Sequence, residues 1–86
     1  MVTTTEEIRT WIERGREKGA THVIVVNDSF SYEYYPVYVG AGEDVRKVQA
    51  RYDEKSGQTM ESVMEVYFLA GDIEAQLSMR RSFTYE

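Results

Sequence analysis

The sequence has 86 residues and a formal net charge of −5, with no cysteine and one histidine. A chain of this length forms one small domain with a thin core, so residues 1–86 are expected to be a single domain. The missing cysteines exclude disulfides and zinc–thiolate sites, and one histidine argues against a histidine metal cluster. The net negative charge, with acidic and basic residues interspersed, disfavours non-specific binding to nucleic acid or to anionic lipid.

The location of the protein is constrained by what the sequence lacks. A membrane-spanning helix needs about 18 consecutive apolar residues, and no such run occurs. The first residues, MVTTTEEIRT, have neither the basic start nor the apolar core of a secretory signal. We therefore expect a cytoplasmic protein that does not associate with membranes.

The first predicted element is a helix at residues 5–18. Thr4 and Glu7 have the spacing of a capping box, which satisfies backbone donors at a helix start. Apolar side chains then recur at helical spacing, at Ile8, Trp11 and Ile12. Gly19 follows, as is typical just after the end of a helix.

Two strands are predicted next, joined as an antiparallel hairpin. The run HVIVVN at 22–27 is apolar at consecutive positions, which indicates a central strand covered on both faces. The turn residues 28–31 lead into a second strand at about 32–39. Pro36 has no amide hydrogen to donate, so this second strand is expected at a sheet edge.

Helices are predicted for the rest of the chain. Glu43 and Asp44 open a short helix that ends near Asp53. A long helix is expected at about 60–80, because apolar residues follow a 3-4-3-4 spacing at Val63, Val66, Ala70, Ile73 and Leu77. Gly71 offers an alternative, a break with Asp72 capping a new helix.

The predicted fold class is therefore α+β, with the element order α-β-β-α-α. Its small sheet is an antiparallel β-hairpin packed on helices, and its last helix is long. Residues 82–86 are either a third strand beside residues 22–27 or a loose end.

Five aromatic residues fall within Asp28–Val39, and they raise the question of function. Alternation along a strand places one set of side chains on a common face: Phe30, Tyr32, Tyr34, Pro36 and Tyr38. The opposite set is expected to pack on the domain's own helices. Because the first strand is apolar on both faces, three helices are expected to cover one face of the sheet well but not both. The aromatic row is then core and rim, or an interface with a second copy or another protein, or a stacking platform for a planar ligand.

Candidate catalytic or metal-binding groups are few. A structural or solvated role is expected for His22, because only the fold could bring the nucleophile or carboxylate that a catalytic histidine needs within hydrogen-bond reach. Asp28 and Glu33 flank the hairpin turn and could hold a hard cation together, although two loop carboxylates are common. The glycines of GAGED precede a helix, but the acidic residues after them repel phosphate. No catalytic residue, metal site or cofactor is predicted.

Four segments together resemble a group of known proteins: TWIERGREKGATHVIVV, YPVYV, GEDVRKVQARY and VMEVYFLAGDIEAQL. The chain is similar to small uncharacterised proteins of bacterial and phage genomes, which have fewer than about 100 residues and no assigned activity. The resemblance implies a cytoplasmic accessory protein and transfers no catalytic or binding residue.

The function expected from these observations is that of a non-enzymatic, homo-oligomeric interaction protein. Its expected contact residues lie in the aromatic row and the helix seam: Phe30, Tyr32, Tyr34, Tyr38, Val63, Val66, Ala70, Ile73 and Leu77. One alternative is an acidic phage-type inhibitor that mimics nucleic acid. Another is a protein that sequesters a small nucleotide-like ligand between subunits, with Arg80 and Arg81 contacting its anionic groups.

Overall fold

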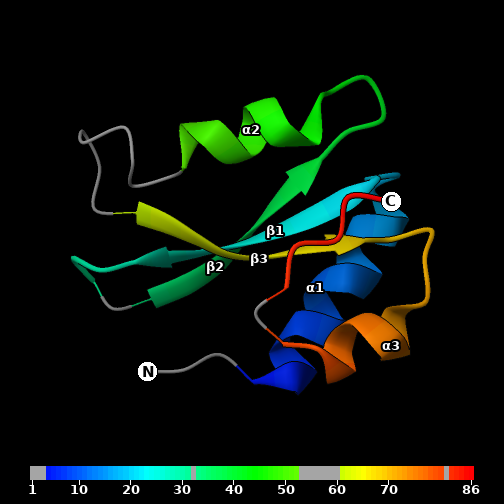
Figure 1. Ribbon diagram of the computed structural model, residues 1–86, viewed down its shortest axis with the longest axis horizontal. Coiled ribbons are helices and arrows are strands. Elements are labelled where there is room, and N and C mark those ends of the chain that lie inside the picture. Colours follow the sequence, from blue (N-terminus) through cyan, green and yellow to red (C-terminus); the bar gives the residue numbers. More distant parts are fainter. Residues whose placement is uncertain (1–3, 32, 53–60, 81) are drawn as a thin grey trace.

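A computed structural model describes residues 4–31, 33–52, 61–80 and 82–86. Within these residues the helices and strands are α1 (Thr5–Glu17), β1 (His22–Asp28), β2 (Glu33–Val39), α2 (Val45–Arg51), β3 (Glu61–Phe68) and α3 (Ile73–Ser78). The strands form an antiparallel sheet in the order β2-β1-β3. Helix α2 covers one face of the sheet, and α1 and α3 cover the other (Figure 1). The fold is α+β with the order α-β-β-α-β-α.

The first helix confirms the prediction from its capping residues. The Thr4 hydroxyl accepts from the Glu7 backbone N–H at 3.2 Å, and the Glu7 carboxylate accepts from the Thr4 N–H at 3.1 Å. Beyond its end, Gly19 has a φ of 75°, a conformation that glycine adopts without steric cost. These local signals mark the start and the end of α1.

The hairpin is also confirmed. β1 is central, and its side chains from His22 to Val26 are buried. β2 lies at the edge, with Pro36 opposite Val25. Short helix α2 begins after Asp44, whose side chain accepts from the Arg46 N–H at 3.0 Å.

The predicted long C-terminal helix is wrong, and so is the predicted element order. Residues 61–68 form strand β3, which pairs with β1, and only Ile73–Ser78 are helical. A register shift opposite Val25 and Val26 explains the misleading spacing. Residues three apart normally lie on opposite faces of a strand, but a bulge absorbs one residue and puts Val63 and Val66 on the same face.

The break at Gly71, offered above as the alternative, is the one that occurs. Its N–H donates to the Phe68 carbonyl in a turn after β3. Asp72 then caps α3, because its carboxylate accepts from the Ala75 N–H at 3.1 Å. The apolar spacing continues across the turn although its members pack in two different clusters, Val63 and Val66 with α2, and Ile73 and Leu77 with α1.

The C-terminal segment 82–86 lies beside β3, not beside β1 as one alternative had it. The Val66 N–H donates to the Ser82 carbonyl at 3.1 Å, and the Thr84 N–H donates to the Val66 carbonyl at 3.0 Å. These bonds form a single parallel bridge between Val66 and Phe83. The segment therefore covers part of the outer edge of β3.

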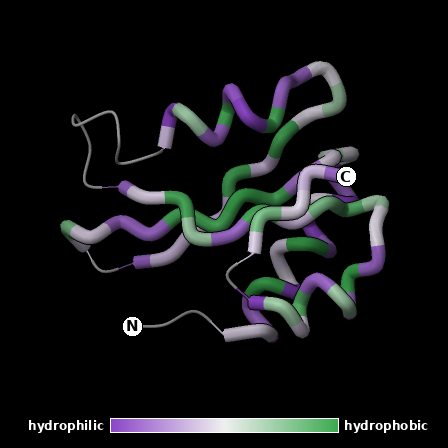
Figure 2. Tube along the Cα trace, in the orientation of Figure 1, coloured by the Kyte–Doolittle hydropathy of each residue, from purple (hydrophilic) through white to green (hydrophobic). Residues whose placement is uncertain are grey.

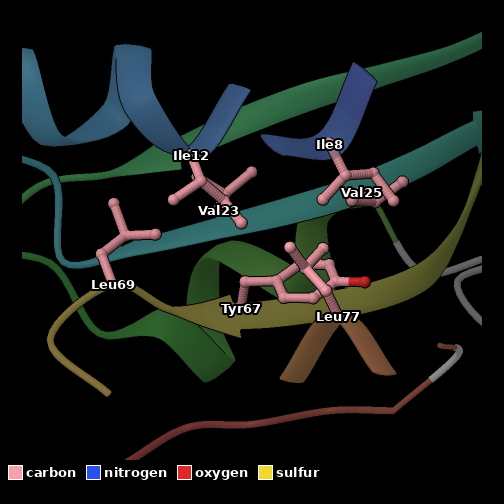
Figure 3. Close-up of a cluster of buried hydrophobic side chains, with 7 residues drawn as sticks. All are labelled: Ile8, Ile12, Val23, Val25, Tyr67, Leu69 and Leu77. Atoms are coloured by element: carbon pink, nitrogen blue, oxygen red, sulfur yellow. The ribbon is translucent and has the colours of Figure 1, made fainter. Parts of the chain in front are cut away.

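Hydrophobic residues concentrate in the strands (Figure 2), and the sheet has a buried cluster on each face. The α1 face holds Ile8, Ile12, Val23, Val25, Tyr67, Leu69 and Leu77 (Figure 3). The α2 face holds Ile24, Val26, Val39, Val48 and Val66, with Tyr85 of the C-terminal segment packed against them. The expectation that one sheet face is left uncovered is therefore wrong, because α2 and the C-terminal segment close the second face.

The outer edge of β3 is also capped by a side chain. Gln76 of α3 is buried, and its carboxamide accepts from the Phe68 N–H at 2.8 Å and donates to the Phe68 carbonyl at 2.9 Å. The Gln76 side chain thus makes the two hydrogen bonds to Phe68 that a neighbouring strand would otherwise make. Capping of this kind prevents an exposed edge from pairing with another chain.

The edge of β2 is blocked in a different way. Val66 bonds outward to the C-terminal segment, so its partner Ile24 directs its backbone groups toward β2. The next pair, Val25 and Pro36, is then not hydrogen-bonded, and the Pro36 nitrogen faces outward. The proline ring occupies the middle of this edge, where an added strand would need a donor.

No helix in residues 4–31, 33–52, 61–80 or 82–86 has the length and apolar character required to cross a membrane. The cytoplasmic location stays a prediction.

Candidate functional site

The residues of the predicted aromatic row do not form one exposed surface. Phe30 is 79% exposed at the tip of the hairpin, where its N–H donates to the Asp28 carboxylate at 2.9 Å. Tyr32 lies outside the described residues. Tyr34 and Tyr38 are half-buried, and both pack against the cluster on the α1 face. The row therefore contributes partly to the core, and its role as an interface stays a prediction.

The predicted helix seam is divided among separate elements. Val63 and Val66 lie on β3 against the α2 face. Ala70 is exposed in the turn before α3, and Ile73 and Leu77 pack on the α1 face. No continuous seam exists, because the helix that would carry it does not.

Arg80, predicted as an anion contact, is tied into the fold. Its Nε donates to the Glu65 carboxylate at 2.7 Å, and the Glu65 side chain is almost completely buried. This hydrogen bond raises the pKa of Arg80. Burial raises the pKa of the neighbouring Tyr67 phenol, and the Glu65 charge raises it further. Arg81 lies outside the described residues, so binding of an anion by this pair stays a prediction.

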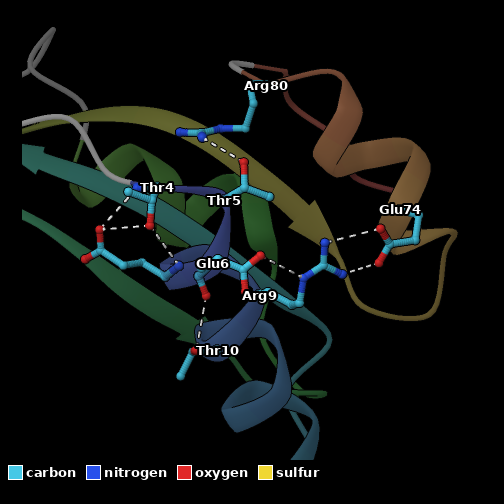
Figure 4. A network of polar contacts seen from close by, with 8 residues as sticks. Thr4, Thr5, Glu6, Arg9, Thr10, Glu74 and Arg80 are labelled. Atoms are coloured by element: carbon cyan, nitrogen blue, oxygen red, sulfur yellow. Dashed lines mark hydrogen bonds and ion pairs between the residues drawn. The ribbon is translucent and has the colours of Figure 1, made fainter.

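Polar contacts also fasten α1 to the elements beside it (Figure 4). Arg9 pairs with Glu74 of α3, and the hydrogen bond between them lowers the pKa of the Glu74 carboxyl. Arg80 Nη1 lies 3.5 Å from the Thr5 hydroxyl. These contacts use the flank of α1 that faces α3.

The opposite flank of α1 borders β2 and carries the strongest candidate site. Trp11, Arg14 and Lys18 are spaced i, i+3, i+7, so they share one side of the helix. The Lys18 ammonium lies 5.1 Å from the centroid of the Tyr38 ring, within cation–π distance. Trp11 and Tyr34, like Tyr38, are half-buried at the margin of the core. We call these five residues the α1–β2 surface: Trp11, Arg14, Lys18, Tyr34 and Tyr38.

Gly15 brings the helix and the strand together at this surface. A Cβ atom at this position would lie 2.9 Å from Leu69 Cδ1, 3.1 Å from Val23 Cγ2 and 3.2 Å from Tyr38 Cδ1. Only glycine lets the helix backbone approach the Tyr38 ring so closely. Burial raises the pKa of the Tyr38 phenol, although the charge of Arg14 partly opposes this. The close contact with the backbone of Gly15 helps to position the tyrosine ring.

The two cations of the α1–β2 surface differ from the other arginines of α1. Arg9 is paired with Glu74, and Arg16 donates to the Leu69 carbonyl at 3.0 Å. Arg14 and Lys18 are exposed, and neither forms an ion pair with any residue that the structure describes. Their charges are therefore available to a ligand or partner.

His22 uses both ring nitrogens inside the fold. Nε2 donates to the Tyr85 carbonyl at 2.6 Å, and Nδ1 lies 2.8 Å from the Thr21 hydroxyl. The ring also packs against Phe68 with centroids 5.2 Å apart. These contacts agree with the structural role expected from the sequence.

Asp28 and Glu33 do stand opposite each other, and Glu61 of β3 stands opposite Asp28 on the other side. Three carboxylate residues thus follow one another across the hairpin end of the sheet. In the described part of the chain, no group of three histidine, cysteine or acidic residues is arranged to hold a metal ion. The acidic-inhibitor hypothesis stays a prediction.

Sequence reasoning missed that α1 supplies cations to the tyrosines of β2. The spacing of Trp11, Arg14 and Lys18 was a visible signal, and so was a glycine in the middle of an otherwise good helix. Neither signal says which strand lies beside that flank, because this depends on the tertiary packing.

A scan against protein-family models found no match, and searches of the curated proteins and of the solved structures found none either.

Proposed function

We propose that this chain is a non-enzymatic interaction protein that binds a second copy of itself through the α1–β2 surface. One observation carries the proposal: the half-buried Tyr38 ring has the Lys18 ammonium over it and Arg14 beside it, and both cations are exposed. Tryptophan, tyrosine and arginine are the residues that contribute most to protein interfaces. Their side chains combine a large apolar area with a polar tip.

The geometry favours binding by side chains over addition of a strand. The outward-facing Pro36 lies in the middle of the free edge of β2, which disfavours backbone pairing there. The outer edge of β3 is occupied by Gln76 and the C-terminal segment. A partner therefore meets the flank of α1 and the aromatic rings beside it.

A second copy fits this surface because its aromatic rings and cations can complement one another. In a two-fold dimer the Arg14 guanidinium of each copy lies over an aromatic ring of the other, while each Lys18 ammonium stays over the Tyr38 ring of its own chain. Only the two Arg14 contacts are new on association, and at about 0.5–1 kcal/mol each they sum to about 1–2 kcal/mol. Their loss weakens the dimer by a factor of about 5–30.

The test is the molecular mass in solution over a dilution series, measured by sedimentation equilibrium or light scattering. The wild-type chain is compared with the double variant Arg14→Glu/Lys18→Glu. The matched control is Lys47→Glu/Arg51→Glu, which makes the same charge change at exposed positions of α2. We expect the wild type and the control to dimerise alike and the Arg14/Lys18 variant to dissociate at much higher concentration. A wild-type mass of one chain at every concentration refutes self-association.

A second candidate is binding of a small planar anion such as a nucleotide. The stretch 28–39 contains no cation that could pair with the phosphate of a stacked nucleotide, but α1 places Arg14 and Lys18 beside Tyr38. The only tryptophan of the chain, Trp11, belongs to this surface and provides a fluorescence signal. Titration with adenosine monophosphate should change that fluorescence saturably in the wild type and not in Arg14→Glu/Lys18→Glu. An unchanged signal at millimolar nucleotide removes this candidate.

A further inference from the structure

The C-terminal segment 82–86 occupies a site built by residues from several other elements. Its backbone pairs with Val66 of β3 through two hydrogen bonds, from the Val66 N–H to the Ser82 carbonyl and from the Thr84 N–H to the Val66 carbonyl. The segment is therefore held in an extended form, parallel to β3. Backbone pairing of this kind provides affinity without selecting a sequence.

Selectivity comes from the contacts of Tyr85. The Arg46 guanidinium lies 4.2 Å from the centroid of the Tyr85 ring, and the Tyr85 hydroxyl donates to the Gln49 side chain at 2.6 Å. The ring also packs against the hydrophobic cluster on the α2 face. A shallow depression of about 220 Å³ is lined by Tyr85 together with Arg46, Gln49 and Ala50.

A further contact holds the backbone of Tyr85 itself. His22 Nε2 donates to the Tyr85 carbonyl at 2.6 Å, so the segment is hydrogen-bonded at Ser82, Thr84 and Tyr85. The ring, the hydroxyl and the carbonyl of one residue thus have partners on α2 and β1. We call this set the Tyr85 site: His22, Arg46, Gln49 and Val66.

Backbone pairing together with a tyrosine-specific set of contacts is typical of a peptide-recognition site, and here the site is filled by residues 82–86 of the same chain. None of the four residues of the Tyr85 site belongs to the segment, so the same contacts are available to an identical segment from another molecule. The bound segment competes from within the chain at an effective concentration of the order of millimolar. Binding in trans becomes visible when this competition is weakened.

We propose that the Tyr85 site is a binding site for an extended, tyrosine-containing peptide, and that its partner is the C-terminal segment of a second copy of this chain. This inference concerns a different surface from the α1–β2 surface and does not depend on it. Recognition requires the tyrosine ring beneath Arg46 and backbone pairing to Val66.

The test uses the full-length chain with Tyr85→Ala, labelled with ¹⁵N, and the acetylated peptide SFTYE, which has the sequence of residues 82–86. We expect saturable chemical-shift changes at the amides of His22 and Val66. The peptide SFTAE should bind at least tenfold more weakly. The wild-type chain, whose site is filled, should also bind SFTYE at least tenfold more weakly than the variant does.

Two results overturn the inference: no saturable change with SFTYE, or an equal response to SFTYE and SFTAE. If Tyr85→Ala does not fold, the wild-type chain is titrated with excess peptide. Displacement of the resonances of residues 82–86 then supports the inference, and their constancy overturns it. The double variant Arg14→Glu/Lys18→Glu separates the two surfaces, because in the Tyr85→Ala background it should bind SFTYE with unchanged affinity.

Discussion

Replacement of Gln76 by alanine tests whether one side chain caps the outer edge of β3. The Gln76 carboxamide makes two hydrogen bonds to the backbone of Phe68, at 2.8 and 2.9 Å, and the side chain is buried. The carboxamide also donates to the Asp72 carbonyl at 3.2 Å. Each of the three bonds contributes about 0.5–1.5 kcal/mol, so Gln76→Ala should lower the free energy of unfolding by about 1.5–4.5 kcal/mol. For a domain of this size that corresponds to a fall in Tm of roughly 6–36 °C.

The near-isosteric variant Gln76→Glu sharpens the test. Its carboxylate still accepts from the Phe68 N–H, but its second oxygen faces the Phe68 carbonyl without a proton to donate. At pH 7 it should therefore be at least as unstable as Gln76→Ala. Below pH of about 4 the carboxyl is protonated and donates again, so the deficit relative to wild type should shrink.

The assay is urea unfolding followed by circular dichroism at pH 7 and at pH 3.5, always against wild type at the same pH. Ser78→Ala serves as the control on α3, because the Ser78 hydroxyl is exposed and, among the residues that the structure describes, donates to the Ala75 carbonyl of its own helix. The control should lie within about 0.5 kcal/mol of wild type. A Gln76→Ala variant within that same range would refute the edge cap.

Three other changes test separate parts of the fold. Gly15→Ala places a Cβ atom 2.9 Å from Leu69 Cδ1. Overpacking of about 1–3 kcal/mol should outweigh the roughly 1 kcal/mol gained in helix propensity, so the variant should be less stable than wild type. Thermal unfolding measures the net loss, and a stabilised variant would contradict the close approach. Burial raises the pKa of Tyr67, so the unfolded chain loses its proton first and stability should fall above pH of about 10, by at most ~1.4 kcal/mol per pH unit for this group. Unfolding free energies between pH 8 and 11 should show a shallower fall in Tyr67→Phe, and an identical slope would exclude Tyr67 as a cause. Glu33→Lys replaces repulsion across the hairpin with attraction to Asp28, and urea unfolding at low salt should show a gain of about 0.2–1 kcal/mol that 1 M salt removes.

The first half of the fold could be predicted because its signals are local. The Thr4 and Glu7 cap, the glycine after α1 and the proline in β2 each act within a few residues of chain. Helix α2 was likewise set by Asp44 at its start. These elements needed no knowledge of what packs against them.

The second half could not be predicted, because one bulge changes the period of the strand. Val63 and Val66 have helical spacing in the sequence but share a strand face through the register shift opposite β1. A bulge is specified by pairing with a distant strand, so the sequence of β3 alone does not reveal it. The candidate surface was hidden for a related reason, since Lys18 and Tyr38 meet only when Gly15 allows α1 to approach β2.

The position of β1 between its two neighbours has a consequence for how the chain folds. β2 follows β1 through a short turn, but β3 reaches β1 only after the whole of β2 and α2 have been passed. Closing that longer loop costs more entropy, so the hairpin should form early and β3 should dock late. In the interval one edge of an uncharged stretch, Val23–Val26, is open to pairing with another molecule. The concentration at which the protein is refolded should therefore decide its yield, whatever the stability of the finished sheet.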